Sequence, residues 1–252
     1  MDATERFTDR VESYRLHRPR YPIEIVDRLQ RECNLQPDAS VVDIAAGTGL
    51  LAEIFLAHGH ATVAIEPNRE MRQTCATLTA RFPVLECREG TAENTGLPSQ
   101  SADLITVGQA LHWFDLPSAR AEFVRILRPG GWCAVVYNER HMGGDPFHEG
   151  YEEILQEFGI DYEMVRHRYL QEERLAGFFG HGNMRQSTFL NEQRLDREAL
   201  TGRILSSSYM PQPDHPRYPT MLGEIETLFA RCAEDGHVRM EYDCIVSYGQ
   251  LE

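Results

Sequence analysis

No apolar run in the 252-residue sequence approaches the roughly 20 residues that a helix needs to cross a lipid bilayer. The amino-terminal residues carry interspersed acidic and basic side chains, where a signal peptide would have an apolar core. We therefore expect neither secretion nor membrane insertion, and we expect a cytoplasmic location.

Close cysteine pairs with the spacing of metal ligands are also missing. The six cysteines are scattered along the chain at Cys33, Cys75, Cys87, Cys133, Cys232 and Cys244. Most of them fall inside apolar helix or strand patterns, which predicts buried free thiols in a reducing compartment. The H-E-x-x-H and G-K-[ST] patterns are absent as well, so the sequence predicts neither a metal centre nor a P-loop.

Positive charge is scarce in this chain. Lys and Arg total 25 and Asp and Glu total 39, which gives a net charge of −14. A chain with this balance repels the phosphate backbone of nucleic acids. The composition therefore argues against a nucleic-acid partner and favours a small-molecule partner.

What the sequence does contain is a regular alternation of apolar strands and helical patterns with short connections. The expected strands are 41–45, 61–66, 84–88, 103–108 and 132–137, and the expected helices are 22–33, 50–58, 68–81 and 117–128. Continuous apolar runs such as Val63–Ile65 are typical of strands buried on both faces. This alternation predicts an α/β fold with a doubly wound, mostly parallel sheet.

The second half of the chain follows a different pattern. Helices are expected at 147–158, 161–178, 196–206 and 219–235, and strands at 186–191 and 237–248. They bring the sheet to seven strands, with an antiparallel C-terminal edge strand and a helical cover. No repeat or flexible linker appears, so we expect one domain over 1–252. It divides into an arm and helix (1–34), a cofactor-binding core (35–140), a mainly helical substrate cover (141–236) and a C-terminal strand (237–252).

The first strand leads into a glycine turn that is typical of nucleoside-cofactor sites. Gly47 and Gly49 let the backbone approach a ligand closely, and Glu66 at the end of the second strand can accept hydrogen bonds from ribose hydroxyls. Asp43 lies inside the first strand, where a carboxylate needs hydrogen-bond donors such as turn amides or an ammonium group. The run also satisfies G-x-G-x-x-A with Ala52, so an NAD-dependent oxidoreductase is an alternative.

Further motifs resemble the class I S-adenosylmethionine-dependent methyltransferases. Within that class they resemble the small-molecule branch with trans-aconitate methyltransferase-like and ubiquinone-biosynthesis-type proteins. The resemblance covers residues 7–138. It rests on Tyr14 with Arg18-Pro19-x-Tyr21-Pro22, the Asp43–Gly49 turn, Glu66-Pro67, Gly90-Thr91-Ala92-Glu93, Gln109-Ala110-Leu111-His112-Trp113-Phe114 and Arg128-Pro129-Gly130-Gly131.

The resemblance implies a Rossmann-like methyltransferase fold that binds S-adenosylmethionine and releases S-adenosylhomocysteine. It implies that Asp43 and the turn from Ala45 through Gly47 to Gly49 hold the methionine part. Glu66 with Pro67 would hold the ribose. The adenine would lie against Thr91, Ala92 and Glu93, and Gln109 would lie beside the methionine or the transferable methyl group.

Two residues depart from the family pattern. Ala45 stands where the family often has its first glycine, and Thr91 stands where an acid commonly meets the adenine amino group. We expect the first to be a small steric change, because alanine is the smallest replacement. The second leaves Glu93 or backbone groups to select the purine.

The arm and the end of the fourth strand supply the remaining candidates. Tyr14 and Arg18 would form a lid that meets the cofactor carboxylate or a carboxylated substrate, since a guanidinium matches a carboxylate. His112 is the candidate general base, with packing beside Trp113 as the alternative role.

The expected function is methyl transfer from S-adenosylmethionine to a small organic acceptor, at oxygen or carbon, with a carboxylate among the candidate groups. Two alternatives stay open at this point. One is the NAD-dependent oxidoreductase, and the other is a non-catalytic S-adenosylmethionine-binding protein.

Overall fold

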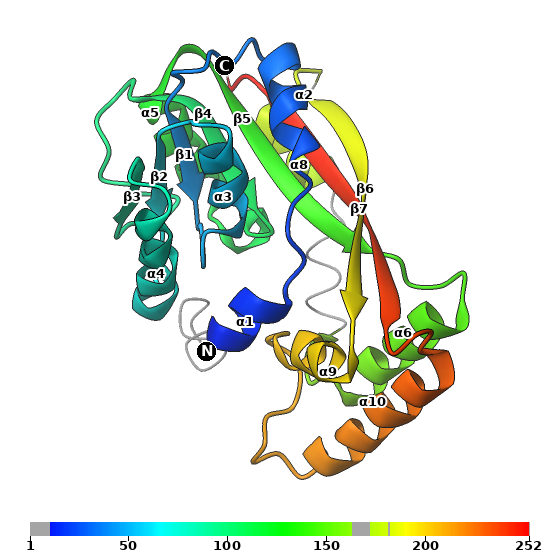
Figure 1. The fold of residues 1–252 in the computed structure, drawn as a ribbon. Coiled ribbons are helices and arrows are strands. Elements are labelled where there is room, and N and C mark those ends of the chain that lie inside the picture. Colours follow the sequence, from blue (N-terminus) through cyan, green and yellow to red (C-terminus); the bar gives the residue numbers. More distant parts are fainter. Residues whose placement is uncertain (1–10, 163–171, 181, 252) are drawn as a thin grey trace.

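A single seven-stranded sheet runs through the part of the chain that the computed structural model describes, which comprises residues 11–162, 172–180 and 182–251 (Figure 1). Its strands are β1 (Val41–Ile44), β2 (Thr62–Ile65), β3 (Leu85–Arg88), β4 (Ala102–Gly108), β5 (Leu127–Arg140), β6 (Arg185–Leu195) and β7 (Val238–Gly249). They lie in the order β3-β2-β1-β4-β5-β7-β6. The first five strands pair in parallel, while β7 is antiparallel to both β5 and β6. The predicted α/β class and mostly parallel sheet are confirmed.

The last strand does not lie at the edge of the sheet. β7 inserts between β5 and β6, so β6, formed by the segment predicted as a strand over 186–191, is the outermost strand. The sequence could not reveal this order, because a strand pattern shows the faces of a strand and not its neighbours.

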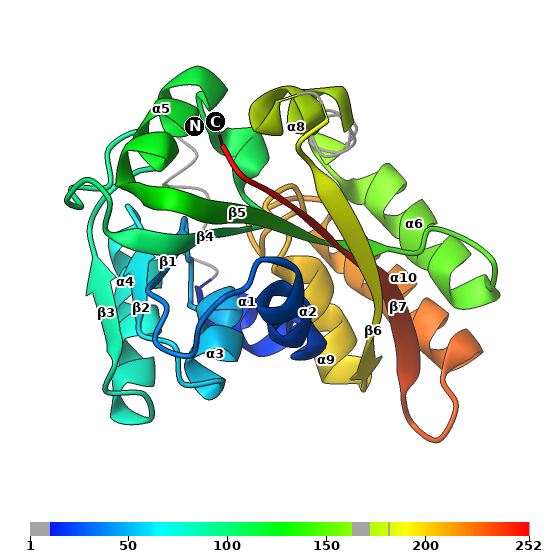
Figure 2. The same ribbon diagram turned by 90° about the horizontal axis from the view of Figure 1, so that it is seen from above.

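Helices cover both faces of the sheet (Figure 2). They are α1 (Val11–His17), α2 (Glu24–Glu32), α3 (Leu50–Ala57), α4 (Arg69–Ala76), α5 (Leu116–Ile126), α6 (Pro146–Phe158), α8 (Glu172–Phe179), α9 (Arg197–Leu205) and α10 (Tyr218–Cys232), with short turns η2 (Thr77–Ala80) and η3 (Leu111–Trp113). Half of the predicted helix at 161–178 falls in 163–171, outside the described residues, and α8 forms its end. None of the described helices is both long and apolar enough to span a bilayer.

Two apolar layers sandwich the parallel strands. α2 and α3 bury residues such as Leu29 and Phe55 against one face, and α5 and α8 bury residues such as Phe123 and Phe179 against the other. β6 and β7 extend beyond these layers, and α6, α9 and α10 pack around their far end (Figure 1). α1 packs against α9, so the arm spans from the parallel sheet to the helical cover.

β1 lies between β2 and β4 in the sheet. From β1 the chain proceeds outward through β2 and β3 on one side, and through β4 and β5 on the other. The carboxyl ends of β1 and β4 are therefore the point where the strand order reverses. Open α/β sheets bind ligands at this point, because the loops that follow the two strands diverge there.

Candidate active site

A cavity of about 270 Å³ lies where the loops that follow β1, β2 and β4 converge. We call it the switch-point cavity. The structure brings nine predicted cofactor residues into its lining, which are Tyr14, Ala45, Gly47, Glu66, Pro67, Thr91, Ala92, Glu93 and Gln109. Trp113 and Phe114 also line it, so both aromatic side chains contribute to the site as well as to packing.

Sequence reasoning missed Asn68 and Met71 in this lining. Asn68 is the N-cap residue of α4, and its Oδ1 accepts a hydrogen bond of 2.9 Å from the Met71 N–H. The signal was present in the sequence, since asparagine directly after Glu66-Pro67 is a typical helix start. A cap at that position places the first turn of α4 beside the second strand's terminal acid.

The Glu66 carboxylate is held by backbone groups. Its Oε2 accepts a hydrogen bond of 2.8 Å from the Gly47 N–H, and its Oε1 accepts one of 2.8 Å from the Asn68 N–H. The side chain is buried, and burial raises the pKa of Glu66 while the two backbone N–H groups act against that rise. A carboxylate has about four lone-pair positions, so two remain for donors in the cavity, such as a pair of hydroxyl groups.

Asp43 is the second buried carboxylate of the site. Its Oδ1 accepts a hydrogen bond of 2.8 Å from the Thr106 hydroxyl, and its Oδ2 accepts one of 3.1 Å from the Ala52 N–H. Burial raises the pKa of Asp43 to about 7, although both hydrogen bonds favour the charged form. Asp43 also lines a small recess of about 30 Å³ beside the glycine turn, which suits it to stabilise a cation placed there.

The backbone turns into the left-handed region directly after β1 and directly after β4. Ala45 has a φ of +53° and Gln109 a φ of +58°. This conformation costs a residue with a side chain about 1–2 kcal/mol. The preference of the family for glycine at the position of Ala45 thus has a conformational cause, in addition to the small steric change that the sequence suggested.

The two glycines of the turn have different roles. Gly47 lines the cavity, and a Cβ added there would project into open space, so a ligand can approach the backbone at this position closely. Gly49 lines neither the switch-point cavity nor the small recess, and a Cβ there would lie 2.8 Å from Cys75 Sγ and 2.8 Å from Leu78 Cδ1. The absence of a Cβ at Gly49 thus allows the start of α3 to pack closely on the α4 region, and cofactor contact by Gly49 stays a prediction.

The loop after β3 brings the predicted purine-binding residues to the cavity. The Thr91 N–H and carbonyl exchange hydrogen bonds of 3.0 and 3.3 Å with Asn94. Glu93 Oε1 accepts a hydrogen bond of 3.0 Å from the Asp115 N–H at the start of α5. These contacts fix the loop while leaving Thr91 exposed and Ala92 buried in the cavity wall.

A second cavity of about 210 Å³ adjoins the first, and we call it the adjoining cavity. Tyr14, Gln109 and Trp113 line both cavities and so form their common wall. Arg18 lines only the adjoining cavity of the two. Its guanidinium lies 4.9 Å from the centre of the Tyr14 ring, and its Nη2 donates a hydrogen bond of 3.0 Å to the Ser206 carbonyl.

His112 does not line either cavity. It is buried, with its ring centre 4.6 Å from that of Trp113 and 6.4 Å from that of Tyr137. The ring packs beside Trp113, which fits the alternative role that the sequence allowed, and the role of general base stays a prediction.

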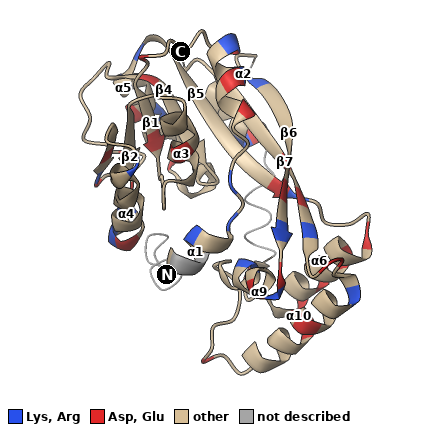
Figure 3. Cartoon of the chain, in the orientation of Figure 1, with Lys and Arg blue, Asp and Glu red and all other residues tan. Residues whose placement is uncertain are grey.

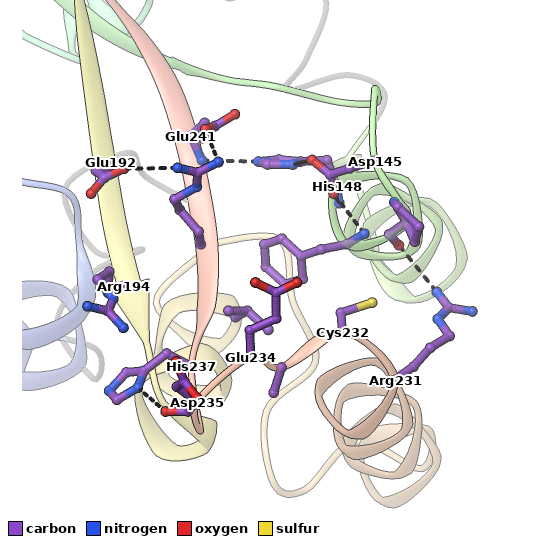
Figure 4. Close-up of a pocket in the computed structure, with 15 residues that line it drawn as sticks. Asp145, His148, Glu192, Arg194, Arg231, Cys232, Glu234, Asp235, His237 and Glu241 are labelled. Atoms are coloured by element: carbon purple, nitrogen blue, oxygen red, sulfur yellow. Dashed lines mark hydrogen bonds and ion pairs between the residues drawn. The ribbon is translucent and has the colours of Figure 1, made fainter.

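A larger hollow, of about 740 Å³, lies elsewhere, between α6, α10 and the ends of β6 and β7 (Figure 4). Several of its charged side chains interact with one another, as Arg239 does with Glu192 and Glu241 and His148 with Asp145. Acidic and basic residues are interspersed along β6 and β7 (Figure 3). None of the predicted site residues lines this hollow.

Comparisons with known proteins agree with this geometry. Residues 42–135 match the family model described as "Methyltransferase domain". An uncharacterized methyltransferase-like protein of Schizosaccharomyces pombe is 27% identical over 98% of this chain and 95% of its own length. An uncharacterized methyltransferase of Mycobacterium bovis is 38% identical over 55% of this chain and 54% of its own length.

Solved structures show the same fold. A proposed type II methyltransferase from Anaeromyxobacter dehalogenans superposes with a TM-score of 0.70 at 22% identity, over 93% of this chain and 98% of that chain. A methyltransferase from Geobacter sulfurreducens, in complex with S-adenosylhomocysteine, has a TM-score of 0.55 at 16% identity, with 98% of both chains covered. Residues 42–135 thus resemble a methyltransferase domain, and the fold is that of the solved methyltransferases.

Proposed function

We propose that this protein is an S-adenosylmethionine-dependent methyltransferase, which transfers the methyl group of that cofactor to a small organic acceptor bound in the adjoining cavity. The observation that carries this proposal is the wall shared by the two cavities, formed by Tyr14, Gln109 and Trp113. A methyl donor and its acceptor must meet at one boundary, and these residues line that boundary from both sides. The small volume of the adjoining cavity favours a small molecule over a macromolecular acceptor.

The residues of the switch-point cavity fit the cofactor. The buried Glu66 carboxylate suits the two ribose hydroxyls, and the Thr91–Glu93 loop suits the adenine edge. The recess beside Asp43 and Gly47 suits the amino-acid end, because a buried carboxylate there favours an ammonium group. The left-handed turns at Ala45 and Gln109 support these residues, because they fix the course of the backbone in the cavity lining.

The cofactor, when bound, supplies a methyl group activated by its positive sulfur. The chain's residues then have to align an acceptor and exclude water, and such alignment lowers a barrier by roughly 7–11 kcal/mol. Gln109 is suited to this task. Its side-chain Nε2 donates a hydrogen bond of 3.1 Å to the Asn138 carbonyl, which fixes the amide at the common wall. Oxygen and carbon acceptors are both compatible with this arrangement, and a carboxylate is among the candidate oxygen groups.

Two measurements test the proposal. Thermal unfolding is recorded with S-adenosylhomocysteine and, separately, with NAD, because the sequence also satisfies the G-x-G-x-x-A fingerprint. A ligand at a hundredfold excess over its Kd stabilises by about 2.7 kcal/mol. Transfer of labelled methyl groups from S-adenosylmethionine is then measured with a panel of small hydroxy, keto and carboxylic acids.

Stabilisation by S-adenosylhomocysteine together with labelling of one acceptor is the expected result. Stabilisation by NAD alone would mean that the cofactor site has been misassigned. Binding of S-adenosylhomocysteine without labelling of any acceptor would favour the non-catalytic binding protein instead.

A further inference from the structure

Arg203 on α9 is a buried cation that lines the adjoining cavity, and its side chain is only 7% exposed. Its Nε donates a hydrogen bond of 3.2 Å to the Tyr242 hydroxyl, and its Nη1 donates one of 3.4 Å to the Ser207 hydroxyl. Both of these partners are neutral. Within the described ranges, neither a carboxylate partner for Arg203 nor an acceptor for its Nη2 is present.

Arg140 lines the same cavity and provides a comparison, because it is a buried arginine with an ion-pair partner. Its guanidinium forms an ion pair with the buried Glu152, and it lies 4.7 Å from the centre of the Tyr151 ring. Its charge is thus balanced inside the protein. Arg203 has neutral hydrogen-bond partners, so its charge is oriented but not balanced by the described residues.

A second cation lies close to Arg203. Arg18 donates to the carbonyl of Ser206, and Arg203 donates to the hydroxyl of the next residue, Ser207. Burial raises the pKa of the Tyr209 hydroxyl, and the charges of both arginines act against that rise. Two guanidinium groups that hydrogen-bond to consecutive residues lie near one another. Both line the adjoining cavity, and Arg18 likewise has no carboxylate partner among the residues described.

A buried cation and a partly buried neighbouring cation with no counter-ion are costly, since each loses hydration and they repel each other. A planar anion placed between them removes both costs, and a carboxylate matches the fork of N–H donors on a guanidinium. Residues that only support the fold do not need this cost of burying positive charge, because neutral side chains of similar size would fill the same space.

We propose that Arg203 and Arg18 bind a carboxylate of the methyl acceptor in the adjoining cavity. This inference rests on the proposed function and narrows it to acidic acceptors. The carboxylate could also come from the amino-acid end of the cofactor. Arg203 and Arg18 line the adjoining cavity and neither the switch-point cavity nor the recess beside Asp43, which favours the acceptor as its source.

The first test uses the wild-type protein saturated with S-adenosylhomocysteine. Binding of benzoate, phenylacetate and succinate is compared by calorimetry with binding of the corresponding neutral amides. We expect at least one acid to bind, with its amide at least tenfold weaker. If no acid binds, or if acid and amide bind equally, the inference is wrong. The comparison is repeated without S-adenosylhomocysteine, so failure of the cofactor proposal would be seen separately from failure of the anion site.

The second test uses Arg203→Gln and Arg203→Lys. Arg203→Gln should weaken binding of the acid at least tenfold while changing the Kd of S-adenosylhomocysteine by less than twofold, and Arg203→Lys should recover part of the loss. Arg194→Gln is the matched control, because Arg194 is exposed on β6 and lies outside the adjoining cavity. A large loss of S-adenosylhomocysteine affinity in Arg203→Gln would assign the site to the cofactor carboxylate and overturn the proposal.

Thermal unfolding of the ligand-free variants provides a readout that a purely structural role would not give. Removal of an unbalanced buried charge should leave the Tm of Arg203→Gln equal to or above that of the wild type. Arg140→Gln breaks the balanced pair with Glu152 and should lower the Tm. A Tm for Arg203→Gln as low as that for Arg140→Gln, with acid binding retained, would mean that Arg203 only supports the fold.

Discussion

The N–H of Gly47 donates a hydrogen bond of 2.8 Å to Oε2 of Glu66, so the glycine turn after β1 and the acid after β2 hold each other in place. The Asn68 N–H holds the other carboxylate oxygen at 2.8 Å. The carboxylate is thereby positioned before a ligand arrives. Two elements that the sequence suggested as separate parts of a nucleoside site are one hydrogen-bonded unit.

Replacement of Glu66 by glutamine tests this unit. One carboxylate oxygen becomes an NH2 group, which cannot accept from a backbone N–H and leaves that buried donor unsatisfied. We expect the free energy of unfolding to fall by about 1–3 kcal/mol. The Kd of S-adenosylhomocysteine should rise at least tenfold, which corresponds to about 1.4 kcal/mol. Calorimetry and urea unfolding measure the two effects.

The matched control for that variant is Glu86→Gln. Glu86 lies on the neighbouring strand β3, is exposed and lines neither cavity. Its substitution should leave the Kd of S-adenosylhomocysteine within twofold of the wild type. If Glu66→Gln behaved like this control, Glu66 would not contribute to cofactor binding.

Asp43 should make ligand binding and stability depend on pH in opposite directions. Burial raises its pKa to about 7 in the folded protein, above its value in the unfolded chain. The stability that Asp43 contributes is therefore present below about pH 4 and is lost as pH rises to 7, by roughly 4 kcal/mol in total. A cation bound beside it favours the charged form, so affinity for S-adenosylhomocysteine should rise between about pH 5.5 and 7.5.

The comparison that isolates this residue is Asp43→Asn, which does not titrate. Urea unfolding of both proteins across this range should show the variant gaining stability relative to the wild type as pH rises. Its affinity for S-adenosylhomocysteine should be lower and nearly independent of pH. Parallel curves for the two proteins in both measurements would show that Asp43 stays charged throughout.

Particular residues show what the sequence could and could not predict. Asp43, Gly47 and Glu66 were predictable because their places depend on local patterns, namely a buried strand, a turn and a strand end. Arg203 was not, because its place in the lining of the adjoining cavity arises from the packing of α9 against the arm and from a hydrogen bond to Tyr242 on β7. The sequence likewise could not separate Gly47, which lines the cavity, from Gly49, whose neighbours come from the α4 region.

His112 gives a prediction that separates the sequence-based expectation from the structure. A general base would be lost in His112→Gln, and turnover would fall by about 100-fold or more with loss of the basic pKa from the rate profile. Because the structure packs the ring against Trp113 and outside both cavity linings, we expect less than a tenfold fall in kcat. Steady-state rates from pH 6 to 9 with an identified acceptor decide between the two, on the condition that circular dichroism shows an intact fold.

The contact between His17 and Gly202 predicts that the arm controls access to both cavities. A Cβ added at Gly202 on α9 would overlap the His17 ring at the end of α1. Gly202→Ala should therefore displace α1, which carries Tyr14 into the lining of both cavities. We expect the Kd of S-adenosylhomocysteine to rise about tenfold. Stability should change little or increase, because alanine favours a helix by up to about 1 kcal/mol and a short terminal helix can move at small cost.

A second substitution makes this prediction specific. His17→Ala combined with Gly202→Ala removes the overlap and should restore most of the lost affinity, whereas loss through a changed α9 would persist in the double variant. Gly223→Ala on α10 is the control, since a Cβ there meets open space and should add helix stability without changing affinity. If Gly202→Ala binds S-adenosylhomocysteine as tightly as Gly223→Ala does, the docking of α1 on α9 is not coupled to the cofactor site. Coupling through this contact would mean that the position of one short helix sets the affinity for the cofactor.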